Sequence, residues 1–443
     1  LVNQLWKAGV PKSVLHFLPT KDDEVGKYLI THKDVDAVVL TGSFETALLF
    51  KEWKPSLRLL AETSGKNSIV VTASADIDTA VKDIIDSAFG HAGQKCSASS
   101  LAILETSIYE NPAFFRQLKD AVTSLKIGDP LDLSTSVGPL ISAPNKNLLK
   151  AINELEDGEE WLIEPKQLGS EYIWSPGVKI NVQPGSWSHQ TEWFGPVLGI
   201  MKARDLKQAV QWQNSVPYGL TAGIQSLNEK ECEYWIENVE AGNLYVNRTT
   251  TGAVVNRHPF GGWKKSSFGP TAKTGGDHYV SMFRKYQLVE HVESLRYELK
   301  RTWEELGNKS IKLGDTESER NFKRYIPYNK VLIVTDDEFS KELTELIFWI
   351  SDLLKVRVKI VSVQDLLSED STLDVSIFEK IRWLATIKEI PNQIFNSEAT
   401  VDDRSLMQNG SQEMLCWVKE QSISITNHRY GNIGAGPQPF KEW

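Results

Sequence analysis

The chain has 443 residues, with 49 lysines and arginines against 58 aspartates and glutamates, and its formal net charge is −9. Hydrophobic residues make up 41% and charged residues 24%, values of an ordinary globular protein, which argues against a disordered or low-complexity chain. The acidic balance argues against a general nucleic-acid or anionic-membrane binder, and no apolar run approaches the roughly 18 residues of a membrane helix.

Along residues 1–300, apolar strands alternate with amphipathic helices. Asp76 or Asp78 is expected to cap a helix that runs to about Phe89, because the apolar residues of this segment share one helical face. A glycine-containing loop follows at 90–95. Strands are expected at 35–40, 69–72 and 100–104. This rhythm predicts an α/β fold with a largely parallel sheet.

The second half continues with a different organisation. Residues 250–276 are rich in Gly, Pro, Thr and Lys and predict a long ordered loop, a kind of segment that is usually functional. A charged stretch over 291–321 predicts an exposed helix and a linker. A strand at 331–334, a helix at 338–354 and a strand at 356–363 then form one βαβ unit. Its first turn carries carboxylates in place of glycines, so no dinucleotide is expected there.

The three cysteines, Cys96, Cys232 and Cys416, lie far apart in the sequence. They predict neither a disulfide framework nor a metal cluster, and no other spacing suggests a metal site. A reducing compartment, the cytoplasm, fits this composition. No signal peptide is visible, and the first residue is Leu1, which suggests a processed or truncated product.

Two residues stand out as candidates for chemistry. Cys96 lies among small residues and glycines in GHAGQKCSAS, where a substrate can approach, and Lys95 beside it favours the thiolate. The commoner alternative for a single free cysteine is a buried structural role. Glu62 lies at the boundary of an apolar segment, where partial desolvation raises a carboxyl pKa toward that of a general base. Its alternative is a surface carboxylate paired with Lys66.

Six short segments in order change this balance: VVLTGS (38–43), AETSGKN (61–67), GQKCSA (93–98), EWFGPV (192–197), GNLYVN (242–247) and PFGG (259–262). The series resembles the aldehyde dehydrogenase superfamily over about residues 1–290. The segments HAGQKCSAS (91–99), TTTGAVV (249–255) and 258–276 resemble the glutamate-semialdehyde (Δ1-pyrroline-5-carboxylate) dehydrogenases, in particular the dehydrogenase part of bifunctional proline-utilisation proteins. The segment 422–436 resembles the C-terminal part of those proteins.

The resemblance implies NAD-dependent oxidation of L-glutamate γ-semialdehyde to L-glutamate, in proline catabolism. Cys96 would attack the aldehyde carbon to form a thiohemiacetal, and Glu62 would activate the water that hydrolyses the later thioester. The backbone N–H of Cys96 would help to hold the oxyanion. The implied NAD-binding residues are Gly42, Ser43, Glu192 and Phe194.

The resemblance also implies a site for the α-carboxylate of the substrate. Ser97 would supply a hydroxyl, and the loop around Gly252 and Ala253 would supply backbone N–H groups. Phe260 would flank the aliphatic part of the substrate. The alternative for this loop is a plain surface connection. For His428 and Arg429 a structural ion pair is expected rather than an anion-binding site.

Family members carry a long segment before VVLTGS that this chain lacks, with the first strands of the cofactor domain and the oxyanion asparagine. We therefore expect a fragment of a longer product that can lack activity alone, with a proline dehydrogenase domain upstream in the full-length form and a homo-oligomeric state. The expected division is: 1–67, the C-terminal part of an incomplete Rossmann-type NAD-binding domain; 68–245, the catalytic domain; 246–295, the substrate-anchor loop and the return to the cofactor and oligomerisation region; 296–321, a linker; and 322–443, an accessory α/β module.

Two alternatives stay open at this point. One is another NAD(P)-dependent aldehyde dehydrogenase, acting on an apolar or succinate-type aldehyde. The other is a non-catalytic, aldehyde-dehydrogenase-like structural module. Retention of Cys96 and Glu62 speaks against the second alternative, and the missing segment speaks for inactivity of this chain.

Overall fold

The computed structural model describes residues 1–426 except residues 22, 271, 308, 315, 317, 369, 370, 388 and 389. His428, Arg429 and the part of the tail segment after residue 426 therefore lie outside the described residues. Four short elements begin the chain: α1 (Val2–Lys7), α2 (Glu24–Thr31), β1 (Val38–Thr41) and α3 (Phe44–Trp53).

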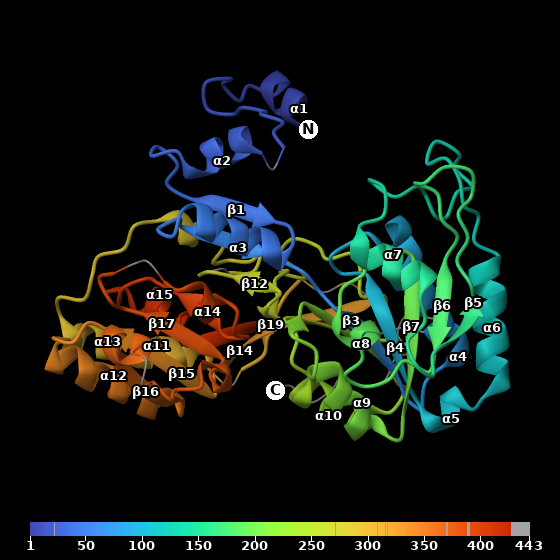
Figure 1. Ribbon diagram of the computed structural model, residues 1–443. Coiled ribbons are helices and arrows are strands. Elements are labelled where there is room, and N and C mark those ends of the chain that lie inside the picture. Colours follow the sequence, from blue (N-terminus) through green and yellow to red (C-terminus); the bar gives the residue numbers. More distant parts are fainter. Residues whose placement is uncertain are drawn as a thin grey trace.

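A ten-stranded sheet runs through the molecule (Figure 1). Its strands in spatial order are β13 (Ile311–Lys312), β14 (Glu319–Pro327), β19 (Val418–Thr426), β10 (Asn243–Val246), β9 (Thr221–Gln225), β3 (Asn67–Val71), β4 (Ser99–Glu105), β7 (Val197–Ala203), β6 (Gly177–Ile180) and β5 (Glu160–Ile163). From β19 to β6 all neighbours are parallel. This arrangement confirms the predicted α/β fold with a largely parallel sheet.

Helices cover both faces of this sheet, because alternate side chains of each strand point to opposite faces. On β3, Ile69 and Val71 join the apolar cluster of one face, and Val70 joins the cluster of the other. The first cluster includes α4 (Ile77–Phe89), α6 (Pro112–Thr123) and α7 (Lys146–Asn153); the second includes α9 (Leu206–Asn214) and α10 (Glu229–Asn238). Shorter helices lie between these elements: η1 (Gly90–Gly93), α5 (Thr106–Tyr109) and α8 (Trp187–Gln190).

Local signals placed several elements correctly. The Asp76 side chain accepts a 3.0 Å hydrogen bond from the Thr79 N–H, which caps α4 as expected for an aspartate at this position. The strand expected at 35–40 is β1, shifted toward the C-terminus. The helix expected from 338 is α12 (Lys341–Leu354), which begins later because Ser340 caps it.

A second parallel sheet lies in the C-terminal part. Its order is β16 (Arg357–Ser362), β15 (Lys330–Thr335), β17 (Lys380–Trp383) and β18 (Thr400–Asp402). One of its faces shares an apolar cluster with α3 and with β2 (Leu59–Glu62), which pairs with β1 and β12 (Ser267–Phe268). The remaining elements are α11 (Val292–Leu306), α13 (Val363–Leu367), α14 (Asn392–Phe395), α15 (Gly410–Met414), η2 (Val280–Phe283), η3 (Val375–Ile377) and the pair β8 (Tyr218–Gly219) and β11 (Trp263–Lys264).

The chain returns to the large sheet after the second one. β19 inserts between β10 and β14, pairing Asn243 with Ser422 in parallel and Phe322 with Ile423 in antiparallel register. Residues after 296 thus contribute strands to both sheets. The expected division of the chain into five parts stays a prediction.

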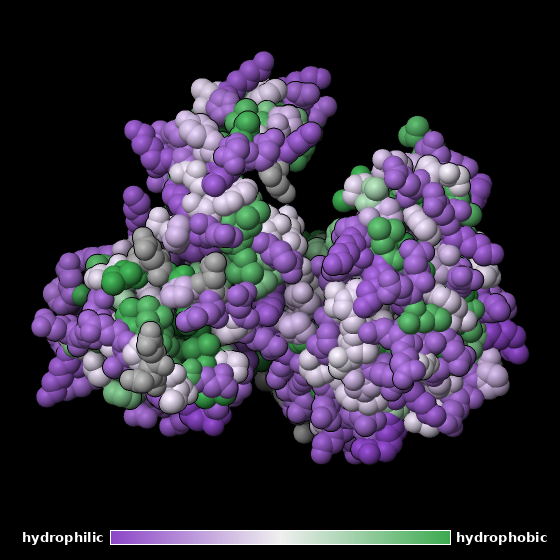
Figure 2. Space-filling model, in the orientation of Figure 1, coloured by the Kyte–Doolittle hydropathy of each residue, from purple (hydrophilic) through white to green (hydrophobic). Residues whose placement is uncertain are grey.

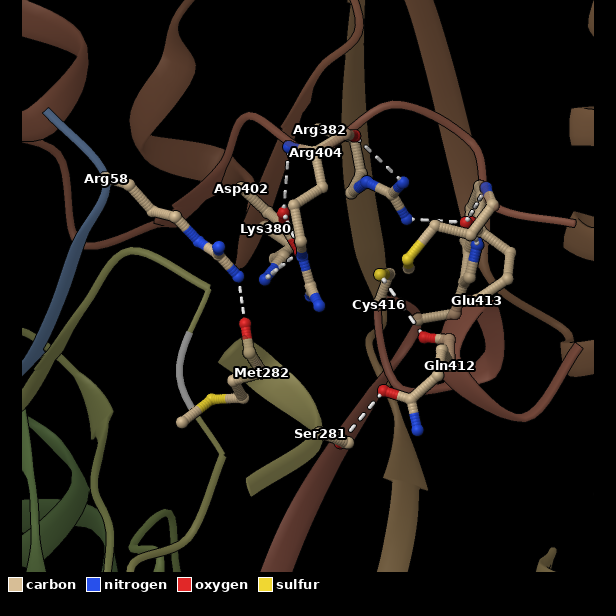
Figure 3. Close-up of polar contacts among 12 residues, drawn as sticks. Arg58, Ser281, Met282, Lys380, Arg382, Asp402, Arg404, Gln412, Glu413 and Cys416 are labelled. Atoms are coloured by element: carbon tan, nitrogen blue, oxygen red, sulfur yellow. Dashed lines mark hydrogen bonds and ion pairs between the residues drawn. The ribbon is translucent and has the colours of Figure 1, made fainter. Parts of the chain in front are cut away.

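A buried group of charges fixes the C-terminal sheet to α15 (Figure 3). Arg382 and Glu413 are fully buried and form an ion pair at 2.9 Å. Asp402, also fully buried, accepts from Arg404 at 2.7 Å and lies 3.4 Å from the Lys380 ammonium. Such buried charges are tolerated only when they are paired and hydrogen-bonded. These pairs therefore hold β17, β18 and α15 in one arrangement.

Candidate functional site

The turn that leads to Cys96 has an unusual backbone conformation. His91, Ala92 and Gly93 have φ angles of 56°, 55° and 68°. These values lie in the left-handed region, which residues other than glycine rarely adopt. A Cβ on Gly93 would lie 2.2 Å from the carbonyl oxygen of Gly195, so this close approach requires glycine. The turn therefore packs directly against the segment that carries two of the expected cofactor-binding residues.

Asn67 fixes the backbone at the cysteine and directly after it. Its buried side-chain amide donates to the carbonyl oxygens of Cys96 at 2.7 Å and Ala98 at 2.9 Å, and its oxygen accepts from the Thr221 N–H at 3.0 Å. Sequence reasoning did not assign this role, although Asn67 ends the segment AETSGKN. A buried amide with its donor and acceptor both used holds its neighbours rigidly.

The pKa values of Glu62 and Cys96 are both raised, and the Glu62 charge contributes to that of Cys96. Burial raises the pKa of Glu62 to about 8, against the lowering effects of the Lys273 ammonium and of the Gly262 N–H, which donates to Oε2 at 3.2 Å. Burial also raises the pKa of the Cys96 thiol, and the Glu62 charge raises it further. The Ser97 N–H and the Lys95 charge lower this pKa, so Lys95 acts in the expected direction, but burial and Glu62 outweigh both of them.

Lys273 is a buried cation behind Glu62 that sequence reasoning did not single out. Its Nζ donates to Asn243 Oδ1 at 2.9 Å and to the Gly261 carbonyl oxygen at 2.7 Å. Burial lowers its pKa to about 8, and the charges of Glu420 and Glu62 counter that effect. Lys273 thus holds the backbone next to the amide that binds Glu62. The side chains of Glu62, Lys273 and Glu420 line a cavity of about 350 Å³ that continues toward the second sheet.

Glu192 is held at the other side of the nucleophile segment. Its Oε1 accepts a 2.9 Å hydrogen bond from the Gly65 N–H, and burial raises its pKa.

The alternative of a surface pair between Lys66 and Glu62 does not hold, because Lys66 is buried with its Nζ 3.5 Å from the centroid of the Trp193 ring. Phe194 has a φ of 53°, and its carbonyl oxygen accepts from Gln94 at 3.3 Å.

Gly42 and Ser43 lie at the carboxyl end of β1. The Gly42 N–H donates to the carbonyl oxygen of Glu62 at 3.2 Å, and Ser43 Oγ accepts from the Thr46 N–H at 3.1 Å, which caps α3. The start of α3 therefore lies beside the end of β2, at the edge where parallel α/β sheets bind ligands. The surface is hollowed between the part built from α1 to α3 and the lobe that carries α6 and α7 (Figure 2).

The expected substrate residues are brought together only in part. Thr250 Oγ1 donates to the Ser97 carbonyl oxygen at 2.9 Å, which joins the start of the loop to the residue after Cys96. Gly252, with a φ of 91°, and Ala253 lie on the exposed tip, and among the described residues no hydrogen bond links them to Ser97. Phe260 pairs through its backbone with Thr274, at 2.9 and 2.7 Å.

The described residues form neither a cluster suited to a metal ion nor a helix suited to a membrane. No group of three or more His, Cys, Asp and Glu side chains there is arranged to hold a metal ion. No helix within that part of the chain combines the length and the apolarity needed to cross a membrane.

Comparison with known proteins places the chain among enzymes. The model of the aldehyde dehydrogenase family matches residues 1–289. The 1-pyrroline-5-carboxylate dehydrogenase of Geobacillus sp. (strain WCH70) is 34% identical over 298 residues, 65% of this chain and 57% of that protein. The enzyme of the same name from Staphylococcus aureus (strain JH1) is 36% identical over 307 residues, 66% of this chain and 58% of that protein. The chain thus spans less than two thirds of these relatives.

Solved structures extend the likeness to the C-terminal part. Proline Utilization A (PutA) from Corynebacterium freiburgense superposes with a TM-score of 0.86 and 39% identity, covering 97% of this chain and 46% of that one. A 1-pyrroline-5-carboxylate dehydrogenase from Thermus with bound NAD gives a TM-score of 0.58 and 35% identity, covering 62% of this chain and 55% of that one.

Proposed function

This chain belongs to the aldehyde dehydrogenase family, and we propose that it carries the nucleophile and the general base of an NAD-dependent L-glutamate γ-semialdehyde dehydrogenase. The observation that carries the proposal is a half-buried Glu62, held by the Gly262 N–H at 3.2 Å, whose charge acts on the Cys96 thiol and whose own pKa is about 8. A carboxyl with that pKa is suited to act as a base near neutral pH. The relatives named for 1-pyrroline-5-carboxylate support the substrate.

The residues of the chain act in sequence. The Cys96 thiolate attacks the aldehyde carbon, which forms a C–S bond and an oxyanion that faces the Cys96 N–H. Once this adduct has been oxidised to the thioester, Glu62 takes a proton from a water molecule that attacks the thioester carbon. The C–S bond then breaks, the acid leaves, and the Cys96 thiolate is restored. Asn67 keeps the Cys96 backbone in place through both halves of this cycle.

The residues around Glu192 fit a dinucleotide. The buried carboxylate of Glu192, oriented by the Gly65 N–H, is an acceptor for ribose hydroxyls, and the start of α3 after Gly42 and Ser43 favours an anion such as a pyrophosphate. Phe194 would pack near the nicotinamide. NAD, when bound, supplies the hydride acceptor for the oxidation. The solved relative with bound NAD supports this choice of cofactor.

For the substrate, Ser97 and the backbone amides of Gly252 and Ala253 would bind the α-carboxylate, with Phe260 beside the aliphatic part. We propose that the full-length protein also carries a proline dehydrogenase domain, acts as a homo-oligomer and lies in the cytoplasm. The similarity to PutA supports the additional proline dehydrogenase domain, because this chain covers only 46% of that protein. The three free cysteines suit a reducing compartment.

The test is NADH formation by the purified chain with glutamate semialdehyde, succinate semialdehyde and propanal. We expect a preference for glutamate semialdehyde and complete loss of turnover in Cys96→Ser. Equal or better turnover of the other two aldehydes would contradict the substrate assignment. Turnover that survives in Cys96→Ser would contradict the mechanism.

A further inference from the structure

A cavity leads from the candidate base to the molecular surface. Glu62, half-buried at the end of β2, lines this cavity of about 350 Å³. Ile377, which is 49% exposed, and the exposed Glu398 line the same cavity beside the second sheet. One water molecule needs only roughly 10–15 Å³, so the cavity has room for a chain of water molecules. Among the described residues that line it, none is expected to bind substrate or cofactor.

Glu420 of β19 is a second carboxyl on the wall of this cavity. The Lys273 N–H donates to its carboxylate, and its Oε1 is buried without a hydrogen-bond partner in the part of the chain that the structure describes. Burial raises the pKa of Glu420; the Lys273 and Lys323 charges oppose this rise, and the Asp277 charge adds to it. An ionised carboxylate with an unsatisfied buried oxygen is unfavourable, so this group is suited to hold a proton.

Lys273 connects the two carboxyls. Its backbone N–H binds Glu420, and its Nζ donates to the Gly261 carbonyl oxygen at 2.7 Å. The next residue, Gly262, donates its N–H to Glu62 Oε2 at 3.2 Å. A Cβ on Gly261 would lie 3.0 Å from Glu62 Oε1 and 3.3 Å from Lys273 Cγ, so a side chain at this position would crowd both groups. This short segment therefore holds both carboxyls against one cavity.

Thioester hydrolysis leaves a proton that has to reach solvent. The attacking water forms a C–O bond with the thioester carbon and gives one proton to Glu62; its other proton stays on the acid, and the C–S electron pair returns to the Cys96 sulfur. Glu62 must lose its proton before it can act again. We propose that this cavity is the exit route of that proton and that Glu420 accepts it from Glu62 through water in the cavity. The inference rests on the proposed function, in which Glu62 is the base.

The test is the hydrolysis of Cys96 acylated by p-nitrophenyl acetate in the 443-residue chain, a reaction that needs no cofactor. Glu420→Gln keeps an acceptor for the Lys273 N–H but cannot carry a proton. We expect its deacylation rate to fall about tenfold, with the acylation burst within about twofold of that of the wild-type chain. Glu240→Gln is the matched control, because Glu240 lines the same cavity but is exposed and paired with Lys264 at 2.8 Å. Its deacylation rate should not change.

Small proton carriers separate proton transfer from a structural role of Glu420. Formate and imidazole should restore the deacylation rate of Glu420→Gln in proportion to their concentration and leave the wild-type rate unchanged. The solvent isotope effect on deacylation should also rise in this variant, since proton exit becomes rate-limiting. A wild-type rate in Glu420→Gln, or a slow rate that neither carrier raises, would overturn the inference. A wild-type chain without an acylation burst or without deacylation would instead overturn the proposed function, and this inference with it.

Discussion

Thr250 donates a 2.9 Å hydrogen bond to the carbonyl oxygen of Ser97, the residue that follows the candidate nucleophile. The Thr250 side chain is fully buried, and Ser99 Oγ lies 3.0 Å from the same hydroxyl. Thr250→Val keeps the shape and removes the donor. We expect kcat/KM to fall about five- to tenfold, the equivalent of about 1 kcal/mol. The control is Thr249→Val, whose hydroxyl bonds within the loop to the Thr251 carbonyl oxygen; a similar loss there would contradict the assignment.

The raised pKa of Glu62 predicts the pH dependence of thioester hydrolysis. Only the ionised carboxylate can accept a proton from water, and its pKa is about 8. Hydrolysis should therefore be slow below about pH 7 and rise to a plateau above about pH 9. The measurement is release of acetate from Cys96 acylated by p-nitrophenyl acetate. A rate already at its plateau at pH 6 would show that Glu62 is not the base.

Lys273 should shift that profile. Its ammonium lowers the pKa of Glu62, so Lys273→Met should move the midpoint of the profile above pH 8. Lys264→Met serves as the comparison, because Lys264 pairs with Glu240 at 2.8 Å and is absent from the charges that act on Glu62. If the midpoint of the profile does not move in Lys273→Met while the thermal stability falls, Lys273 has a structural role only and does not tune the pKa of Glu62.

The cysteines should differ in their reaction with iodoacetamide. Cys96 is half-buried at the site, whereas Cys232 and Cys416 are fully buried and burial raises the pKa of each to about 12. We expect labelling of Cys96 alone in the native chain. Because its thiol pKa is also raised, the rate should climb with pH beyond the range of an ordinary thiol. Peptide mapping after short exposures at several pH values checks both expectations.

The ion pair of Arg382 with Glu413 should dominate the stability of the C-terminal sheet. Arg382→Met leaves Glu413 buried without its cation, and we expect a loss of about 3–5 kcal/mol in the free energy of unfolding. Arg404→Met should cost less, since Asp402 keeps its ion pair with Lys380. Denaturant unfolding compares the two, and equal losses would contradict the ranking.

Part of this structure follows from local sequence signals. The helix capped by Asp76 and the strands beside it are set by side-chain periodicity and a single cap, and both can be recognised in a short window. Glu62 and Cys96 were found by their sequence context. The pKa of Glu62 also depends on Lys273, a lysine in a Gly- and Pro-rich loop whose burial no local pattern indicates. Asn67 and Thr250 gain their roles from partners that other strands bring to them.

The insertion of β19 between β10 and β14 also has no local signal. Within 418–426 only residues 422–426 (SISIT) alternate between polar and apolar residues, which is compatible with a strand but indicates no partner. Its parallel pairing with Asn243–Val246 is long-range, because a parallel pair always needs a crossover of about a dozen residues or more. The later start of the helix expected at 338–354, at Lys341, is a smaller error, because both Glu338 and Ser340 are reasonable starts until the Ser340 cap is seen.

The same insertion has a consequence for synthesis of the chain on the ribosome. β10 is the seventh of the ten strands in chain order and β19 the last, so at translation rates of about 5–20 residues per second β10 waits on the order of ten seconds for its neighbour. During that interval the apolar edge Asn243–Val246 has no strand beside it on one side, and an unpaired edge of this kind recruits other chains. Nascent chains of this protein therefore need protection at this edge, and slow codons between residues 246 and 418 would lengthen the exposure.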